Sequence, residues 1–424
     1  MTDNFVQQPT TADLFKIPRQ LGYLCYPRCN QSQFFNETGM NTAKAYIYKI
    51  AGASRLSPRW SLPSGHALIS NQGLIQVVVS PKPKLQRQFQ IGYHTSLRRP
   101  SNTENMSARV RDRVPIEPQR VDAPLTRSAT FLVVTVADTP QAVDTVRSIL
   151  ADLDNLAKNV SIRDLSASFA CTVGIGSNAW DRVTRMRRPA ELHPFRAIHG
   201  QKHTAVSTPG DLLFHIRSER RDLCFEFERQ LLGALGDAVK VVDETEGFRY
   251  FDVRDLLGFV DGTANPVGQD VSASTLVTTE EDASAVGGSY VVVQKYVHNM
   301  KTWNDLSTEQ QEAVIGRKKL DNVELQDPAE GKQQPHKSLA TIVDDDGNVH
   351  EILRDNMPFG SPGSEQFGTY FIGYSKQLWV IERMLQRMFI GYPPGLHDKL
   401  LDYSTPLTGV TFFAPSADLL KRLR

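Results

Sequence analysis

The nine residues from Gly258 to Pro266, Gly-Phe-Val-Asp-Gly-Thr-Ala-Asn-Pro, form the most informative segment of this sequence. The glycines on either side of Asp261 let the backbone turn sharply or lie against a flat ligand, because neither carries a Cβ atom. The spacing alone favours a turn at a strand end, since Asp-Gly and Asn-Pro are common turn dipeptides. The apolar flanks Leu256-Leu257 and Phe259-Val260 indicate that Asp261 is partly buried. A buried carboxylate needs a partner or a task, so Asp261 is a candidate functional residue.

A second candidate segment begins at Gln333-Gln334-Pro335-His336. The residues that follow predict a β-hairpin with strands over Leu339–Val343 and Val349–Arg354, joined by an Asp- and Gly-containing turn. Folding this hairpin back brings Arg354 towards His336. A lone histidine is usually a surface or core residue and an arginine at a strand end is usually solvated, so the spacing alone assigns neither a function.

The chain from about residue 115 has the pattern of a folded α+β protein in which a similar order of elements occurs twice. Strands interleaved with helices in two like-ordered halves predict two ferredoxin-like domains, antiparallel sheets with helices, packed together. We place the domains at residues 106–266 and 267–424. The expected strands are Phe131–Val136, Ser168–Gly176, Phe248–Val253, Ser289–Tyr296, Gly368–Tyr374 and Val410–Ala414, and the expected helices are Ala142–Asn155, Ser307–Arg317 and Leu378–Met388.

The first 105 residues have a different composition, with an excess of Lys and Arg and many Ser, Asn, Gln and Pro residues. We expect little packed structure there. The segment is either upstream sequence read into the chain, with Met106 as the natural start, or a targeting or regulatory extension; a further domain is less favoured. Cys25 and Cys29 have no second pair or nearby histidine, so their spacing is interpreted as accidental rather than as a zinc site.

The whole chain of 424 residues has a formal net charge of only +1. This balance gives no argument for a nucleic acid or membrane surface as partner. The sequence has no apolar run long enough for a membrane helix and no secretory or twin-arginine signal, so we expect a cytoplasmic protein. Cys171 and Cys224 are interpreted as buried thiols of a reducing compartment.

The segment Gly258–Pro266 resembles the glycine-bracketed aspartate motif of dye-decolourising peroxidases, which are haem proteins. Similar segments precede and follow it in the family's order, over roughly residues 115–420, and the chain looks closest to the compact intracellular branch. These segments are Glu246–Arg254 (EGFRYFDVR), Gly287–Asn299 (GGSYVVVQKYVHN), Ile315–Lys318 (IGRK), Pro335-His336, Ile352–Gly360 (ILRDNMPFG) and Tyr403–Ser416 (YSTPLTGVTFFAPS).

The resemblance implies a role for each matching residue. His336 matches the proximal ligand of the haem iron, Asp261 the distal carboxylate and Arg354 the distal arginine. Asn356 matches a polar position facing the distal pocket, and Asp398 matches the acid that hydrogen-bonds the proximal imidazole. The segment Lys-Ser-Leu-Ala after His336 departs from the pattern of other branches, which puts the packing and polarity of the proximal side in doubt. Gly262, Phe259, Met357 and Phe359 are expected to contact the haem, although core packing is an equally good interpretation of the last three.

The implied function is that of a peroxidase with one haem b per chain. It would reduce hydrogen peroxide and oxidise one-electron donors such as phenols, dyes, Mn(II) or porphyrins through a high-valent iron-oxo intermediate. The alternative is a haem storage or delivery protein with incidental peroxidase activity. We expect a homo-oligomer. Relatives packaged in a protein shell carry a C-terminal tail, and this chain ends at Lys421-Arg-Leu-Arg424, so a shell partner is not expected.

The remaining aromatic and histidine residues are interpreted as structural. Trp180, Trp303 and Trp379 are expected to be core aromatics rather than electron relays. A core position is also expected for His215, where the ring is hydrogen-bonded. Three further histidines, His193, His199 and His203, match no metal spacing and are expected in a solvated loop.

Overall fold

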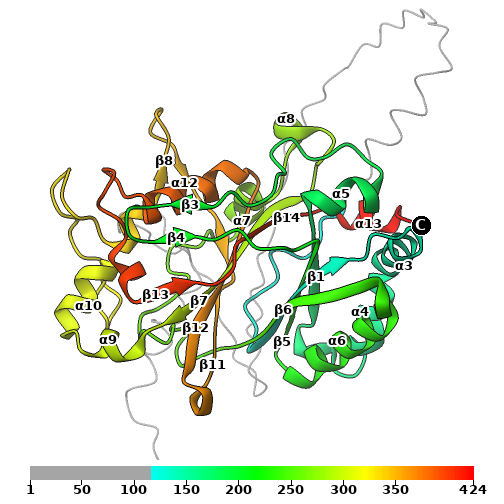
Figure 1. Cartoon of the computed structure of the whole chain (residues 1–424), viewed down its shortest axis with the longest axis horizontal. Helices are drawn as coiled ribbons and strands as arrows, with labels where there is room; N and C mark the ends of the chain where they lie inside the picture. Colours follow the sequence, from blue (N-terminus) through cyan, green and yellow to red (C-terminus); the bar gives the residue numbers. More distant parts are fainter. Residues whose placement is uncertain (1–115) are drawn as a thin grey trace, which may run out of the picture. The chain divides into compact units, whose positions relative to one another are not determined.

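A computed structural model of the chain describes residues 116–424 (Figure 1). The predicted extension 1–105, Met106 and the Cys25–Cys29 pair lie outside the described residues. Among those that are described, no helix has the length and apolar character required to cross a membrane. Both Cys171 and Cys224 are free thiols; Cys224 is buried, as expected, whereas Cys171 is only half-buried.

One antiparallel sheet of ten strands runs through the described part of the chain. Its N-terminal half has the order β2-β5-β1-β6, and its C-terminal half has the order β10-β12-β7-β14. The halves join where β14 pairs with β2, with Phe412 opposite Gly176 and Phe413 opposite Ile175. The strands are β1 (Ser128–Val136), β2 (Ala170–Gly176), β5 (Leu212–Ser218), β6 (Val239–Phe248), β7 (Ser289–His298), β10 (Leu353–Arg354), β11 (Met357–Ser361), β12 (Gln366–Ser375), β13 (Ser404–Pro406) and β14 (Val410–Ala414).

The helices bury one face of each half of the sheet. Helix α6 packs on β1 and β5, with α4 beside α6 (Figure 1), and α12 packs on β12 and β7. The α+β prediction with antiparallel sheets is confirmed, while the domain boundaries at 106–266 and 267–424 stay predictions. The helices are α3 (Pro140–Ala151), α4 (Leu153–Ser161), α5 (Ser177–Thr184), α6 (Arg221–Leu235), α7 (Gln269–Thr275), α8 (Thr279–Asp282), α9 (Met300–Asn304), α10 (Thr308–Ile315), α11 (His336–Leu339), α12 (Leu378–Phe389) and α13 (Ala417–Lys421).

Two predicted elements differ from the observed structure, one near residues 139–161 and the other near residues 248–254. The expected helix Ala142–Asn155 is two helices, because the backbone leaves the helical conformation at Asp152, between α3 and α4. The expected strand Phe248–Val253 is wrong, since β6 ends at Phe248. The next residues turn, with positive φ at Phe251 and Val253, and Arg254 bridges to both Tyr250 and Val260. This reversal delivers the Gly258–Pro266 loop to the C-terminal half.

The predicted hairpin after His336 is much shorter than expected. Its strands are the two-residue pair β8 (Ile342–Val343) and β9 (Val349–His350), closed by Asp344, whose carboxylate accepts the N–H groups of Asp346 and Asn348. Leu353–Arg354 leaves the hairpin and pairs with the edge of β12 instead. The sequence period cannot distinguish these outcomes, because a free sheet edge competes with the hairpin for the same backbone groups.

Candidate active site

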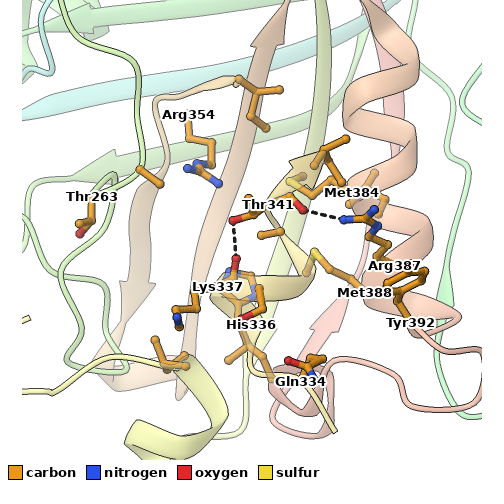
Figure 2. Close-up of a pocket in the computed structure, with 18 of the residues that line it drawn as sticks. Thr263, Gln334, His336, Lys337, Thr341, Arg354, Met384, Arg387, Met388 and Tyr392 are labelled. Atoms are coloured by element: carbon orange, nitrogen blue, oxygen red, sulfur yellow. Dashed lines mark hydrogen bonds between the residues drawn. The ribbon is translucent and has the colours of Figure 1, made fainter. Parts of the chain in front are cut away.

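A cavity of about 1250 Å³ lies in the C-terminal half of the structure. It is larger than typical small-molecule pockets, which span about 300–1,000 Å³. Loops and helix ends on several elements line it, so segments far apart in the sequence meet there (Figure 2). The apolar wall is formed by Leu257, Phe259, Ile342, Phe371, Val380, Met384 and Met388.

His336 enters this cavity from the first residue of the short helix α11. Its Nδ1 lies 2.7 Å from Oδ2 of Asp398, a carboxylate with no solvent exposure. The other oxygen of Asp398 accepts the N–H of Leu400 at 3.0 Å. Burial lowers the pKa of His336, but the charge and hydrogen bond of Asp398 outweigh burial, and the net pKa is raised. The pairing fixes the ring and leaves Nε2 as the nitrogen available to a ligand, as expected for the His336–Asp398 pair.

The divergent segment after His336 anchors α11 rather than loosening it. Lys337 forms salt bridges with Glu324 at 2.7 Å and Asp327 at 2.6 Å, and Ser338 donates to the same Asp327 carboxylate at 2.8 Å. The Lys337 side chain is only 12% exposed, although both acidic partners are about half exposed. The polar residues that depart from the family pattern therefore fix the helix that carries His336.

Asp261 also lines the cavity, from the turn between Val260 and Gly262. Its backbone N–H donates to Val253 at 2.9 Å, and its Oδ1 accepts the N–H of Gly262 at 2.7 Å. Gly262 has φ +72°, a conformation that a residue with a Cβ adopts only under strain. Asn356 donates to the same Oδ1 over a longer 3.4 Å. The turn at Gly262 and the amide of Asn356 thus hold a partly exposed carboxylate at the cavity wall.

Arg354 is positioned by a side chain that the sequence interpretation overlooked. Asn265 accepts the Arg354 N–H on Oδ1 at 3.0 Å and donates Nδ2 to the Arg354 carbonyl at 2.7 Å. The Asn265 amide therefore makes the two backbone hydrogen bonds that a neighbouring strand would otherwise make with Arg354. Within residues 116–424, the Arg354 guanidinium forms no salt bridge, and the carboxylates nearest to it act only through their charge. Burial lowers its pKa while the nearby Asp261 opposes that effect, and an arginine remains cationic under both influences.

Strand alternation separates two predicted haem contacts from the cavity. Arg354 and Asn356 line the cavity, whereas Met357 and Phe359 belong to the core beside Phe131 and Tyr370. The structure therefore does not bring Met357 and Phe359 to the cavity wall, because neighbouring residues of an extended chain point to opposite sides. Phe259 and Gly262 do line it.

The residue between Arg354 and Asn356 faces the same core. Asp355 pairs at 2.7 Å with Arg217 of β5, and both side chains are essentially unexposed. His215 lies beside this pair, with Nδ1 2.9 Å from the Tyr374 hydroxyl, which agrees with the expected core histidine. The extended segment 354–356 therefore contributes to the cavity on one side and to a buried ion pair on the other.

Asp255 is a cavity-lining acid that the sequence interpretation did not select. It accepts the N–H of Phe259 at 2.9 Å, and burial raises its pKa to about 7. The apolar residues on both sides of Gly258 could have indicated that the nearby Asp255 is buried. Trp180 and Trp303 are buried core aromatics, as expected, and Trp379 is partly buried against the core.

The residues of the cavity fit a haem group by their donor chemistry. An imidazole oriented by a buried carboxylate is the usual axial donor to haem iron. Apolar side chains form the surrounding wall, and Arg317, Arg383 and Arg387 on the lining can pair with carboxylates. Figure 2 shows Arg354 and His336 approaching the cavity from different elements, and Arg387 donating to the carbonyl of Thr341.

Comparison with known families decides the assignment. The family model "Dyp-type peroxidase, N-terminal" matches residues 118–249, and "Dyp-type peroxidase, C-terminal" matches residues 252–419. The chain belongs to the DyP-type peroxidase family. The predicted haem-dependent peroxidase, which reduces hydrogen peroxide and oxidises one-electron donors, is thereby confirmed, as is haem as its cofactor.

Individual DyP-type relatives agree with this assignment. A dye-decolorizing peroxidase of Mycobacterium tuberculosis is 50% identical over 305 residues, which cover 72% of this chain and 90% of the relative. A variant of Rhodococcus jostii DypB solved in complex with heme has 53% identity and a TM-score of 0.70, covering 72% of this chain and 98% of that structure. An encapsulated DyP-type peroxidase of Mycobacterium smegmatis has 50% identity and a TM-score of 0.69, covering 73% and 98%.

Proposed function

We propose that His336 would hold the haem iron in this peroxidase, and that Asp261 and Arg354, which line the same cavity, would act on hydrogen peroxide. The observation that carries the proposal is the 2.7 Å contact between His336 and the fully buried Asp398. When haem is bound, its iron supplies the redox chemistry that cleaves the O–O bond and then oxidises the donor.

The proximal residues set the electron donation of the axial nitrogen. The Asp398 carboxylate holds the Nδ1 proton of His336 and increases the basicity of the ring. Asp398 is itself fixed by the N–H of Leu400 and by its own N–H, which donates to Met388 at 2.8 Å. A strongly basic axial imidazole favours higher oxidation states of a metal ion, which a peroxidase needs.

The distal carboxylate moves a proton between the two oxygens of peroxide. Asp261 accepts the proton that leaves the attacking oxygen and returns it to the departing oxygen, directly or through a water molecule. Gly262 and Asn356 both donate to Oδ1, and Oδ2 has no hydrogen-bond partner within residues 116–424. One oxygen therefore holds the side chain and the other handles the proton.

The distal arginine stabilises negative charge. The guanidinium of Arg354 attracts the anionic form of peroxide and offsets the charge that develops as the O–O bond breaks. Asn265 holds the backbone of Arg354 on both its N–H and carbonyl sides, so this cation is positioned before peroxide arrives. Pre-positioned charge avoids the cost of reorganisation during the reaction.

The proposal also includes the electron donor, the assembly state and the cellular location of the protein. A DypB variant has been solved in complex with manganese, which supports Mn(II) as one donor to test beside phenols and dyes. The homo-oligomer, the cytoplasmic location and the absence of a shell partner stay predictions. The encapsulated relative from Mycobacterium smegmatis defines the competing outcome for the shell. Native gel filtration would distinguish them, since a shell complex elutes far ahead of a small oligomer.

The test of this proposal is the absorption spectrum of the haem-loaded protein before and after peroxide. His336→Ala should abolish the normal Soret band and peroxide turnover, whereas His199→Ala, on the exposed surface, should preserve both. In haem-loaded protein, Asp261→Asn and Arg354→Leu should each lower turnover by about 10²–10³-fold without loss of haem. Unchanged spectra and turnover in His336→Ala would refute the assignment. Negligible turnover in the parent protein, unaffected by both distal changes, would favour the haem-carrier alternative.

A further inference from the structure

Two histidines and an aspartate meet outside the haem cavity, at a position for which the peroxidase reaction has no use. His203 lies in the turn between β3 (Ile198–His199) and β4 (Thr204–Ala205). Asp402 is the last residue of a 3₁₀ turn (Lys399–Asp402) that follows α12, and His397 lies two residues before that turn. Their ligand atoms all lie within 4.8 Å of one another. His203 was expected in a solvated loop without an acidic partner, and the structure corrects this: its acidic partner lies 199 residues further along the chain.

The three side chains point their donor atoms at one place. His203 Nε2 lies 2.8 Å from Asp402 Oδ1, and His397 Nε2 lies 3.0 Å from the same oxygen. The two imidazole rings have centroids 5.0 Å apart and an interplanar angle of 64°, so they approach edge to face rather than stacking. Two Nε2 atoms and a carboxylate oxygen converging in this way can surround one ion after small side-chain adjustments.

The backbone holds each donor in place without any ion. Gly200 donates its N–H to the His203 carbonyl at 2.9 Å, and a Cβ on Gly200 would lie 2.0 Å from the Phe389 carbonyl. The β3–β4 turn is therefore packed tightly on the end of α12. The carbonyl of His397 accepts from Gln333 Nε2 at 2.9 Å. The side chains of His203, His397 and Asp402 are 19%, 10% and 20% exposed, which leaves a face open for water as a fourth ligand.

We propose that His203, His397 and Asp402 bind a divalent transition-metal ion of borderline softness, with zinc as the representative ion. Two imidazoles and one carboxylate, completed by water, form a common zinc set, whereas Mn(II) prefers sites richer in oxygen. This site is separate from the haem cavity, whose lining contains none of the three residues. It does not depend on the roles assigned to His336, Asp261 and Arg354.

Two lysines near Asp402 determine how tightly the ion can bind. Lys202 Nζ lies 2.6 Å from Asp402 Oδ1, the oxygen shared by both histidines, and Lys399 Nζ lies 3.8 Å from Oδ2. Lys202 is 58% exposed, so its ammonium can move into solvent when a metal ion takes the oxygen. An ammonium that competes for a ligand atom weakens metal binding. Removing Lys202 should therefore tighten the site, a result that a purely structural ion-pair cluster would not give.

The proposed metal site lies next to the residues of the proximal side of the haem cavity, so a bound ion would affect them. His397 directly precedes Asp398, and Asp402 ends the turn Lys399–Asp402 that Asp398 caps through Leu400. A bound ion would connect this segment to the β3–β4 turn and so restrain the carboxylate that orients His336. We therefore expect metal binding to raise the thermal midpoint of the holoenzyme.

The test is isothermal titration calorimetry of haem-loaded, chelator-treated protein with zinc chloride. Wild-type protein should bind one zinc ion per chain saturably and bind Mn(II) at least about tenfold more weakly. Both His203→Ala and Asp402→Asn should weaken zinc binding at least about tenfold. His199→Ala is the matched control, an exposed histidine of the same hairpin, and should bind zinc normally. Lys202→Met should tighten zinc binding by about fivefold, equivalent to removing roughly 1 kcal/mol of competition.

Three results would overturn the site. The first is no saturable zinc binding by either the wild type or Lys202→Met, a surface change that preserves the fold. The second is unchanged binding in both His203→Ala and Asp402→Asn with the Soret band intact, which would place the ion elsewhere. The third is tighter binding of Mn(II) than of zinc, which would refute the class of ion.

Discussion

The two sides of the haem cavity are built in opposite ways. On the proximal side, Asp398 has no exposed surface and both of its oxygens are engaged, by His336 and by the N–H of Leu400. On the distal side, Asp261 is partly exposed, and Arg354 makes no salt bridge within the described chain. The proximal groups are satisfied by the protein itself, whereas the distal groups are oriented but left with capacity for a substrate.

The difference matches two different tasks: the proximal groups hold a haem ligand in place, and the distal groups are proposed to act on a reactant. A fully paired carboxylate transmits a constant effect to one imidazole, because nothing else can reach it. In the proposed reaction, a distal group exchanges partners as peroxide arrives, reacts and leaves, so part of its side chain must stay free. The Gly262 N–H holds one oxygen of the Asp261 carboxylate, and the Asn265 amide holds the backbone of Arg354, so the second Asp261 oxygen and the Arg354 guanidinium stay available.

Of the changes that test this comparison, the largest loss of peroxide turnover should come from weakening the His336–Asp398 pair. Asp398→Asn removes the negative charge that makes His336 basic, so we expect peroxide turnover to fall by about 10–100-fold with haem retained. Stopped-flow spectroscopy with peroxide measures this rate, and resonance Raman spectroscopy should show a weaker iron–imidazole bond. Asp237→Asn, at an exposed position away from the cavity, is the control. Full turnover with an unchanged iron–imidazole signal would show that the pairing is only structural.

A smaller effect should follow from removing the distal support. Asn265→Ala leaves the N–H and carbonyl of Arg354 without their partners, a loss of about 1–3 kcal/mol of positioning and stability. We expect the rate of reaction with peroxide to fall by about tenfold while the proximal iron–imidazole signal stays constant. Asn155→Ala, on the exposed side of α4, should have no effect. A change in the proximal signal of Asn265→Ala would contradict the independence of the two sides.

The smallest effect concerns the pH dependence of stability through Asp255. Burial raises its pKa from the ordinary 3.8 to about 7, so the folded protein keeps this proton over a pH range where the unfolded chain has lost it. Asp255 therefore favours unfolding increasingly as pH rises from about 4 to about 7.

Asp255→Asn should raise the thermal midpoint at pH 7 and flatten its decline over that range, because the amide oxygen can still accept the N–H of Phe259. Thermal unfolding monitored by circular dichroism at several pH values measures this effect. Asp237→Asn again serves as the control. An identical pH profile for Asp255→Asn and the parent would mean that Asp255 is charged in the folded protein.

The sequence was sufficient for the parts of the site that depend on residue type and local order. The strand at Val410–Ala414 is predicted with the bounds found. Of the predicted site residues, Asp261, His336, Arg354 and Asn356 line one cavity, and Asp398 is buried behind the cavity wall, where it contacts His336. The assignment of His336 as the ligand stays a prediction, since it depends on the family resemblance rather than on periodicity.

The features that could not be predicted from the sequence depend on contacts between residues that are far apart along the chain. Asn265 was interpreted as part of a turn dipeptide, because nothing local shows that its amide reaches Arg354, 89 residues away. The same holds for His203, which meets Asp402 only after α12 and the β3–β4 turn pack together. Met357 and Phe359 are predicted either to contact the haem or to pack in the core, and the structure places them in the core. Strand alternation from Arg354 favours the core position, because it puts them on the opposite side from the cavity.

The three residues 354–356 have a consequence for attempts to redesign this enzyme. Their outer members, Arg354 and Asn356, line the haem cavity, while Asp355 is bound to Arg217 in the other half of the sheet. A library that randomises the whole segment would lose most members to misfolding before any gain in substrate range could be seen, because an unpaired buried ion costs about 3–5 kcal/mol. Variation restricted to Asn356, with Asp355 and Arg217 held constant, would explore new donors while preserving the seam between the two halves.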